Sequence, residues 1–118
     1  IGGGVFYYVQ IRSTPQKTLQ AYCDAVTAND SLALYNTYSS AVQARVSEQQ
    51  LDQALQVIEF TTGGFTSCTV ENSNIQETGS VAVGKIDFTT KRGKTYSDTI
   101  DLVNENGQWK VQHNASLI

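Results

Sequence analysis

The amino-acid sequence predicts an α+β domain in which the helices come first and an antiparallel sheet follows. Apolar residues recur at helical spacing through the first half of the chain, whereas β-branched residues, alternating polarity and turn signals dominate from Phe65 onward. A chain of 118 residues has room for one hydrophobic core. We therefore expect a single domain over residues 13–118, with three helices packed on a curved, four-stranded antiparallel sheet.

The composition is that of a folded chain without an electrostatic footprint for nucleic acid. Hydrophobic residues make up 40% and charged residues 16% of the sequence, and the net charge is -3. The basic residues are scattered except for "KRGK" at positions 91–94, which is typical of a solvated hairpin tip rather than a phosphate-binding patch. We expect no nucleic-acid partner.

The first twelve residues differ in character from the rest. "IGGGVFYYVQI" is apolar and aromatic with no charge before Arg12, and the sequence contains no methionine. A spanning helix needs about 20 apolar residues, so this segment is too short to span a membrane. We expect residues 1–12 to be the C-terminal stub of a membrane anchor or signal segment. The alternative is a first strand of the domain, which the run of glycines disfavours.

Capping signals and apolar stripes predict the three helices. Ser13 or Thr14 caps the first helix, and its buried stripe consists of Leu19, Tyr22, Cys23 and Val26. Asp30 caps the second helix, which covers residues 31–40. Ser47 begins the third with a capping box, and its apolar face consists of Leu51, Ala54, Leu55 and Ile58.

Turn signals divide the second half into four strands. We expect them at residues 65–76, 80–90, 95–103 and 108–115, separated by the hairpin turns "ETGS", "KRGK" and "NENG". In the second strand the apolar alternation slips by one residue at Gly84-Lys85. We expect a β-bulge there, because a bulge repairs the register and bends the sheet.

The two cysteines fall on elements that should face each other. Cys23 lies on the apolar stripe of the first helix, and Cys68 lies in the first strand of the sheet that this helix should cover. An even number of cysteines in a small domain favours a disulfide and an oxidising compartment. Two buried free thiols are the alternative. A metal site would need more ligands than the sequence spacing supplies, so we expect none.

The order of these elements and several segments resemble the nuclear-transport-factor-2-like (NTF2-like) superfamily, whose fold is a cystatin-like α+β cone. Within it, the chain is similar to bacterial extracytoplasmic lumazine-binding-like domains of unknown function. The matching segments are "TPQKTLQAYCDAVTANDSLALYNTYSS", "SEQQLDQAL", "SCTV" and "LVNENGQWKV". The resemblance covers residues 13–113 and implies a bent sheet and helices that enclose a cavity.

The superfamily's enzymes, such as ketosteroid isomerases and dehydratases, carry acid and base groups in this cavity. Asp98 shares strand parity with Tyr96 and Ile100, so it should face the apolar side and could act as a base. His113 could stand near it. We predict no catalytic residue, because the superfamily's acid-base pattern is otherwise unmatched, and keep this pair as the candidates should a reaction occur.

Aromatic side chains with polar tips suit a cavity lining as well as a core. The candidates for lining the ligand cavity are Tyr22, Tyr35, Tyr38, Tyr96 and Trp109. Core packing is the alternative for each of them, and Trp109 should anchor the last strand against a helix.

The sequence predicts a non-catalytic, extracytoplasmic domain tethered to the cell membrane that binds a small ligand or a protein partner. The alternative is a small lyase or isomerase that uses Asp98 as its base. Pairing of two copies through the sheet is compatible with both. We expect no cofactor.

Overall fold

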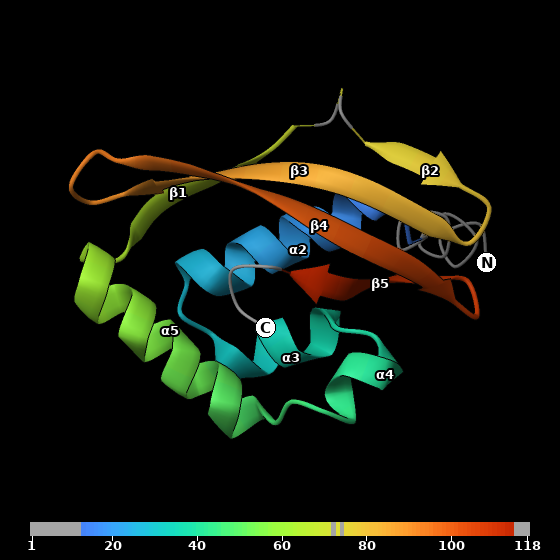
Figure 1. The fold of residues 1–118 in the computed structure, drawn as a ribbon, viewed down its shortest axis with the longest axis horizontal. Helices are drawn as coiled ribbons and strands as arrows, with labels where there is room; N and C mark the ends of the chain where they lie inside the picture. Colours follow the sequence, from blue (N-terminus) through green and yellow to red (C-terminus); the bar gives the residue numbers. More distant parts are fainter. Residues whose placement is uncertain (1–12, 72, 74, 115–118) are drawn as a thin grey trace, which may run out of the picture.

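The computed structural model of the chain describes residues 13–71, 73 and 75–114, so the predicted membrane stub at 1–12 lies outside the described residues. The described part begins with four helices, one more than predicted, which lie on one side of a twisted sheet (Figure 1). The helices are α2 (Pro15–Thr27), α3 (Ser31–Thr37), α4 (Ser40–Gln43) and α5 (Glu48–Thr62).

The predicted caps begin the helices where the sequence indicates. The side chain of Thr14 accepts a hydrogen bond from the Lys17 amide at the start of α2, and Ser47 and Gln50 form the capping box of α5. Gly63 ends α5 in the left-handed conformation, with a φ of 81°, which glycine adopts without steric cost. The short α4 was not predicted, because four residues are too few to display a helical period.

The sheet has five strands rather than the four predicted. They are β1 (Phe65–Val70), β2 (Gln76–Thr78), β3 (Val81–Thr90), β4 (Thr95–Glu105) and β5 (Gln108–Asn114). Their order is β1-β3-β4-β5, all pairs are antiparallel, and β2 also pairs with β3. The predicted first strand, 65–76, is thus two strands, because the polar sequence "ENSN" between them is unsuited to a strand.

The bulge predicted at Gly84-Lys85 is wrong. Gly84 pairs with Ile100 and Lys85 with Thr99 in one unbroken register. The inward positions of this strand include Ala82, Gly84 and Ile86, while Val81 and Val83 are exposed on the outer face. The small inward residues make room for α2, since a Cβ atom at Gly84 would overlap Cδ1 of Leu19.

Irregular register occurs at two other places in the sheet. One lies in β1 between Phe65 and Ser67. The other lies in β5, opposite the step from Asp101 to Leu102 in β4. In the second case the extra residue is Gln112, whose side chain accepts a hydrogen bond from Ser39 Oγ at 2.7 Å. This irregularity therefore ties β5 to the start of α4.

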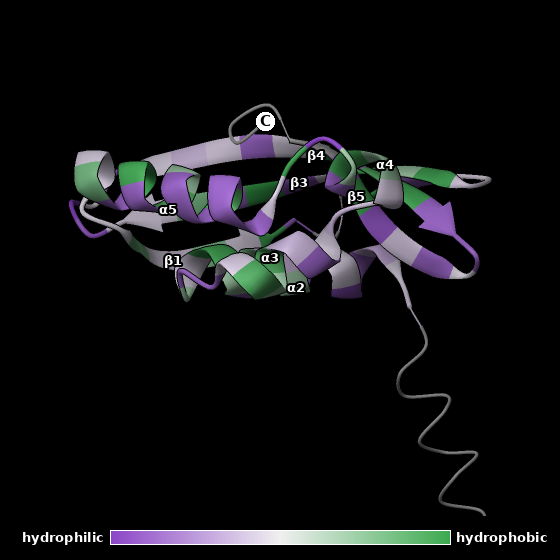
Figure 2. Ribbon diagram, turned by 90° about the horizontal axis from the view of Figure 1, so that it is seen from below, coloured by the Kyte–Doolittle hydropathy of each residue, from purple (hydrophilic) through white to green (hydrophobic). Residues whose placement is uncertain are grey.

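A disulfide between the buried Cys23 and the partly buried Cys68 joins α2 to β1, as predicted, with 5.4 Å between the Cα atoms. It lies in a core built from α2, α3, α5 and the inner face of the sheet. The buried residues of α5, Leu51 and Leu55, lie one helical turn apart, which is typical of a helix with one buried face. Figure 2 shows that this helix carries both hydrophilic and hydrophobic residues. Within residues 13–71, 73 and 75–114, no helix is both long and apolar enough to cross a membrane.

Candidate functional site

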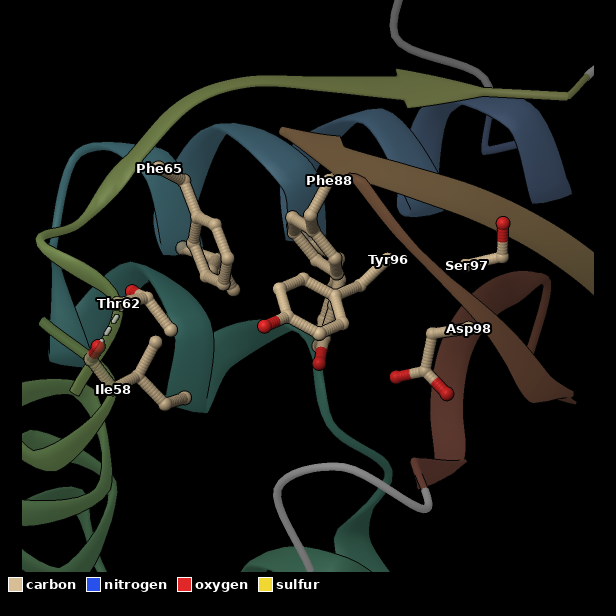
Figure 3. Close-up of a pocket in the computed structure, with 9 residues that line it drawn as sticks. Ile58, Thr62, Phe65, Phe88, Tyr96, Ser97 and Asp98 are labelled. Atoms are coloured by element: carbon tan, nitrogen blue, oxygen red, sulfur yellow. Dashed lines mark hydrogen bonds between the residues drawn. The ribbon is translucent and has the colours of Figure 1, made fainter. Parts of the chain in front are cut away.

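A cavity of about 310 Å³ opens between α2, α5 and the adjoining part of the sheet (Figure 3). Its walls come from five elements that are distant in sequence: α2, α5, β1, β3 and β4. The cavity therefore exists only in the folded chain, and its size depends on how far α5 stands from the sheet.

Apolar and aromatic side chains form most of the wall. Val26 of α2 and Ile58 of α5 line the helical side, and Phe65, Phe88 and Tyr96 line the sheet side. The rings of Phe65 and Phe88 are stacked, with 4.7 Å between their centroids. Two glycines with positive φ, at positions 63 and 64, turn the chain from α5 into β1 and so bring Phe65 over the cavity.

Asp98 supplies the carboxylate of the site. It lies on the inward face of β4 and is only 8% exposed. Figure 3 shows Asp98 and Tyr96 extending from β4 into the same space, whereas the neighbouring Ser97 points the other way and donates a hydrogen bond to Asp87. Oδ2 of Asp98 has no hydrogen-bond partner among the described residues. The inward orientation agrees with the parity that the sequence predicts.

Two buried tyrosines lie beside this carboxylate. The rings of Tyr22 and Tyr38 meet edge to face with 6.3 Å between centroids, and both side chains are at most 1% exposed. Their hydroxyls influence each other's pKa, yet neither has a hydrogen-bond partner of ordinary geometry in the described part of the chain.

Both tyrosines stay protonated over the ordinary pH range. Burial, with a contribution from Tyr38 and Asp98, raises the pKa of Tyr22 well above its usual value. Burial, reinforced by Asp98 and partly offset by Tyr22, raises the pKa of Tyr38 to about 12. The polar end of the cavity thus combines the Asp98 carboxylate with the neutral hydroxyl of Tyr22, whereas Tyr38, another predicted cavity residue, packs against Tyr22 and does not line the cavity.

The structure brings together some of the predicted site residues and separates others. Tyr22, Tyr96 and Asp98 line the cavity. Tyr35 does not line it; its hydroxyl donates to the backbone oxygen of Gln43 at 3.4 Å.

Trp109 also lies away from the cavity, in the core. It is 7% exposed, and its backbone holds β5 on the start of α2. Its amide donates to Ser13 Oγ at 2.9 Å, and its carbonyl accepts from Thr18 Oγ1 at 2.8 Å. The backbone of His113 pairs with Asp101, but its side chain lies outside the described residues, so the predicted pairing with Asp98 is untested.

Comparisons with known proteins identify the fold. No protein-family model and no curated protein matches the chain. Among solved structures, a candidate NTF2-like transpeptidase from Campylobacter jejuni is similar, with a TM-score of 0.66 and 14% identity over 86% of this chain and 99% of its own. A SEC-C motif-containing protein from Rhodopseudomonas palustris has a TM-score of 0.65 and 14% identity over 91% of this chain and 83% of its own.

A candidate dehydratase of the NTF2-like family from Streptomyces avermitilis has a TM-score of 0.60 and 11% identity, over 84% of this chain and 88% of its own. The chain therefore has the NTF2-like fold that the sequence resemblance implies. Sequence identities this low establish the fold but not the function, because one fold can serve many unrelated functions.

Proposed function

We propose that the chain is a non-catalytic binding domain that holds a small, mainly apolar molecule in the cavity beneath β4. The observation that carries this proposal is the Asp98 carboxylate, which is nine-tenths buried at the cavity wall and has an oxygen without a partner among the described residues. A buried polar group without a partner is costly, and a ligand group that bonds to it removes the cost.

The cavity has the general character of a ligand site. Ligand pockets in proteins are mostly apolar, with a few converging polar groups, and measure about 300–1,000 Å³. At about 310 Å³, this one suits a molecule with one ring or a short chain. Phe65 and Phe88 offer the apolar body a stacked aromatic wall, and Asp98 fixes the orientation of the polar end.

We place this domain outside the cytoplasm, tethered through residues 1–12. The disulfide between Cys23 and Cys68 supports an oxidising compartment, because such bonds rarely persist in the cytosol. The apolar, aromatic character of the first eleven residues supports the tether. Fractionation of the native cells, followed by thiol labelling with and without reduction, tests both parts of this assignment.

A fragment screen by thermal shift tests the binding function. We expect small apolar fragments with one polar group to raise the unfolding temperature of the wild type. A bulky side chain at Thr62, which lines the cavity at the end of α5, should block it, so Thr62→Trp should abolish the shifts. Thr61→Trp is the matched control, because the exposed Thr61 precedes it on the same turn. Equal shifts in the wild type and both variants would overturn the proposal.

A small lyase or isomerase remains the second candidate, and one observation favours it. The partnerless oxygen of Asp98 at the cavity wall can accept a proton from a bound carbon acid. If the chain is such an enzyme, the wild type should exchange the α-protons of a small ketone for deuterium in deuterated water, and the Asp98→Asn variant should do so more slowly. Equal rates would remove this candidate while leaving the binding function intact.

The outer face of the sheet supports a homodimer as the partner arrangement. Val81 and Val83 are 51% and 40% exposed there, on the face opposite the helices. Pairing of two copies would cover them. Sedimentation equilibrium should then detect a dimer that Val83→Lys dissociates, and a strict monomer at high concentration would exclude it.

A further inference from the structure

We propose that the cavity recognises a primary amine, whose ammonium group bonds to Asp98 and Tyr22 while its apolar body packs against the aromatic wall. This inference rests on the proposed binding function and specifies its ligand class.

The charge balance of the cavity favours a cation. Asp98 is buried in the wall, and among the described residues that line the cavity none is Lys or Arg. A buried carboxylate without a counter-charge is strongly unfavourable, so the missing positive charge should come with the ligand. An anionic ligand would meet like charge at the same place.

The hydrogen-bonding groups point to the same chemistry. Oη of Tyr22 and Oδ2 of Asp98 belong to residues that line the cavity, and both atoms are buried without a hydrogen-bond partner among the described residues. An ammonium group has three donors and no acceptor. It can therefore satisfy the carboxylate and a neutral tyrosine oxygen together. An alcohol brings only one donor, and a ketone brings none.

The aromatic wall suits the rest of such a molecule. Phe65, Phe88 and Tyr96 lie beside the space that Asp98 faces (Figure 3) and offer it apolar surface. The ammonium group of Lys94 lies 5.3 Å from the centroid of the Tyr96 ring, so this ring already has a cation near it. The small volume of about 310 Å³ limits the body to one ring or a short alkyl chain. Benzylamine, 2-phenylethylamine and hexylamine are suitable probes.

Calorimetric titration of these amines and of alcohols of the same shape tests the inference. We expect each bound amine to have an affinity at least tenfold higher than its alcohol, and the corresponding carboxylates to bind more weakly than either. Asp98→Asn should lower the amine affinity at least tenfold while changing the alcohol affinity less than threefold. Tyr22→Phe should lower the amine affinity by a smaller factor.

The matched control separates the site from general attraction to an acidic protein. Asp24→Asn removes a carboxylate from the exposed face of α2, two residues after Tyr22, and should leave every affinity unchanged. Thermal unfolding of each variant verifies that it is folded.

The outcomes distinguish the two proposals. Alcohols or ketones that bind in the cavity as tightly as the amines would overturn the amine inference and leave the binding function standing. Equal losses of amine affinity in Asp98→Asn and Asp24→Asn would also overturn the amine inference and leave the binding function standing. If no amine, alcohol, ketone or carboxylate binds, and Thr62→Trp changes nothing in the fragment screen, both proposals fail.

Discussion

Three buried oxygens set the chemistry of this molecule at the scale of single residues. They belong to Tyr22, Tyr38 and Asp98, and in the described part of the chain each lacks a hydrogen-bond partner. Native proteins satisfy most buried polar groups, so exceptions indicate a ligand, a water molecule or a functional strain. Tyr22 and Asp98 line one cavity, and the proposed ligand site is built on these two residues.

Asp98 should reduce the stability of the empty protein. Asp98→Asn removes a buried carboxylate that has no Lys or Arg beside it among the described residues lining the cavity, so we expect the free energy of unfolding to rise by about 0.5–2 kcal/mol. Denaturant unfolding of this variant and of Asp24→Asn measures the difference. A loss of stability in Asp98→Asn would mean that the carboxylate already has a favourable partner in the folded chain.

The two buried tyrosines should titrate late. The pKa of Tyr38 rises from 10.0 to about 12 in the folded state, and that of Tyr22 rises well above 10.0. Because the folded pKa is the higher one, their contribution to stability is complete below pH 10 and is lost as the pH rises toward 12. Tyrosinate absorbance should therefore show a late component that Tyr22→Phe and Tyr38→Phe each reduce. Loss of absorbance near pH 10 in both variants would contradict the burial of these hydroxyls.

Gly84 should be intolerant of a side chain, although its φ is ordinary. A Cβ atom there would overlap Cδ1 of Leu19. We expect Gly84→Ala to cost about 1–3 kcal/mol, the usual range for overpacking. Leu19→Val removes the overlapping atom, so the double variant should be more stable than the sum of the single effects predicts. Strict additivity in denaturant unfolding would show that the two residues do not compete for space.

At the scale of elements, the disulfide fastens α2 to the edge of the sheet. It closes a loop of 45 residues, which corresponds to about 4 kcal/mol on the chain-entropy model. We expect the Cys23→Ala/Cys68→Ala variant to lose about that amount in the free energy of unfolding, and reduction of the wild type to lower its unfolding temperature. A loss below about 1 kcal/mol would mean that packing alone holds α2 on β1.

The elements that could be predicted are those with local signals. Caps at Thr14, Asp30 and Ser47 begin three helices as expected, because capping depends on residues only three positions apart. The alternation in β3 was misread at Gly84. Its exposed valines at 81 and 83 look like core residues in the sequence, and only the packing of Leu19 shows that the small residues face inward.

At the scale of the whole molecule, the candidate site could be predicted only in part. Strand parity and the helical stripe identify Asp98, Tyr96 and Tyr22. These patterns cannot show whether Phe65 and Phe88 line a cavity or pack in the core. The answer depends on the distance between α5 and the sheet. This distance is a property of the assembled layers, and no local pattern encodes it.

The most direct test of the proposed amine site is chemical-shift mapping of the ¹⁵N-labelled protein during titration with benzylamine and benzyl alcohol. We predict that the largest shifts lie at the amides of the cavity wall, on both sides of the space between α5 and β4, including Ile58, Phe65 and Asp98. Shifts spread over the surface, or gathered on the outer face of β3 at Val81 and Val83, would contradict it.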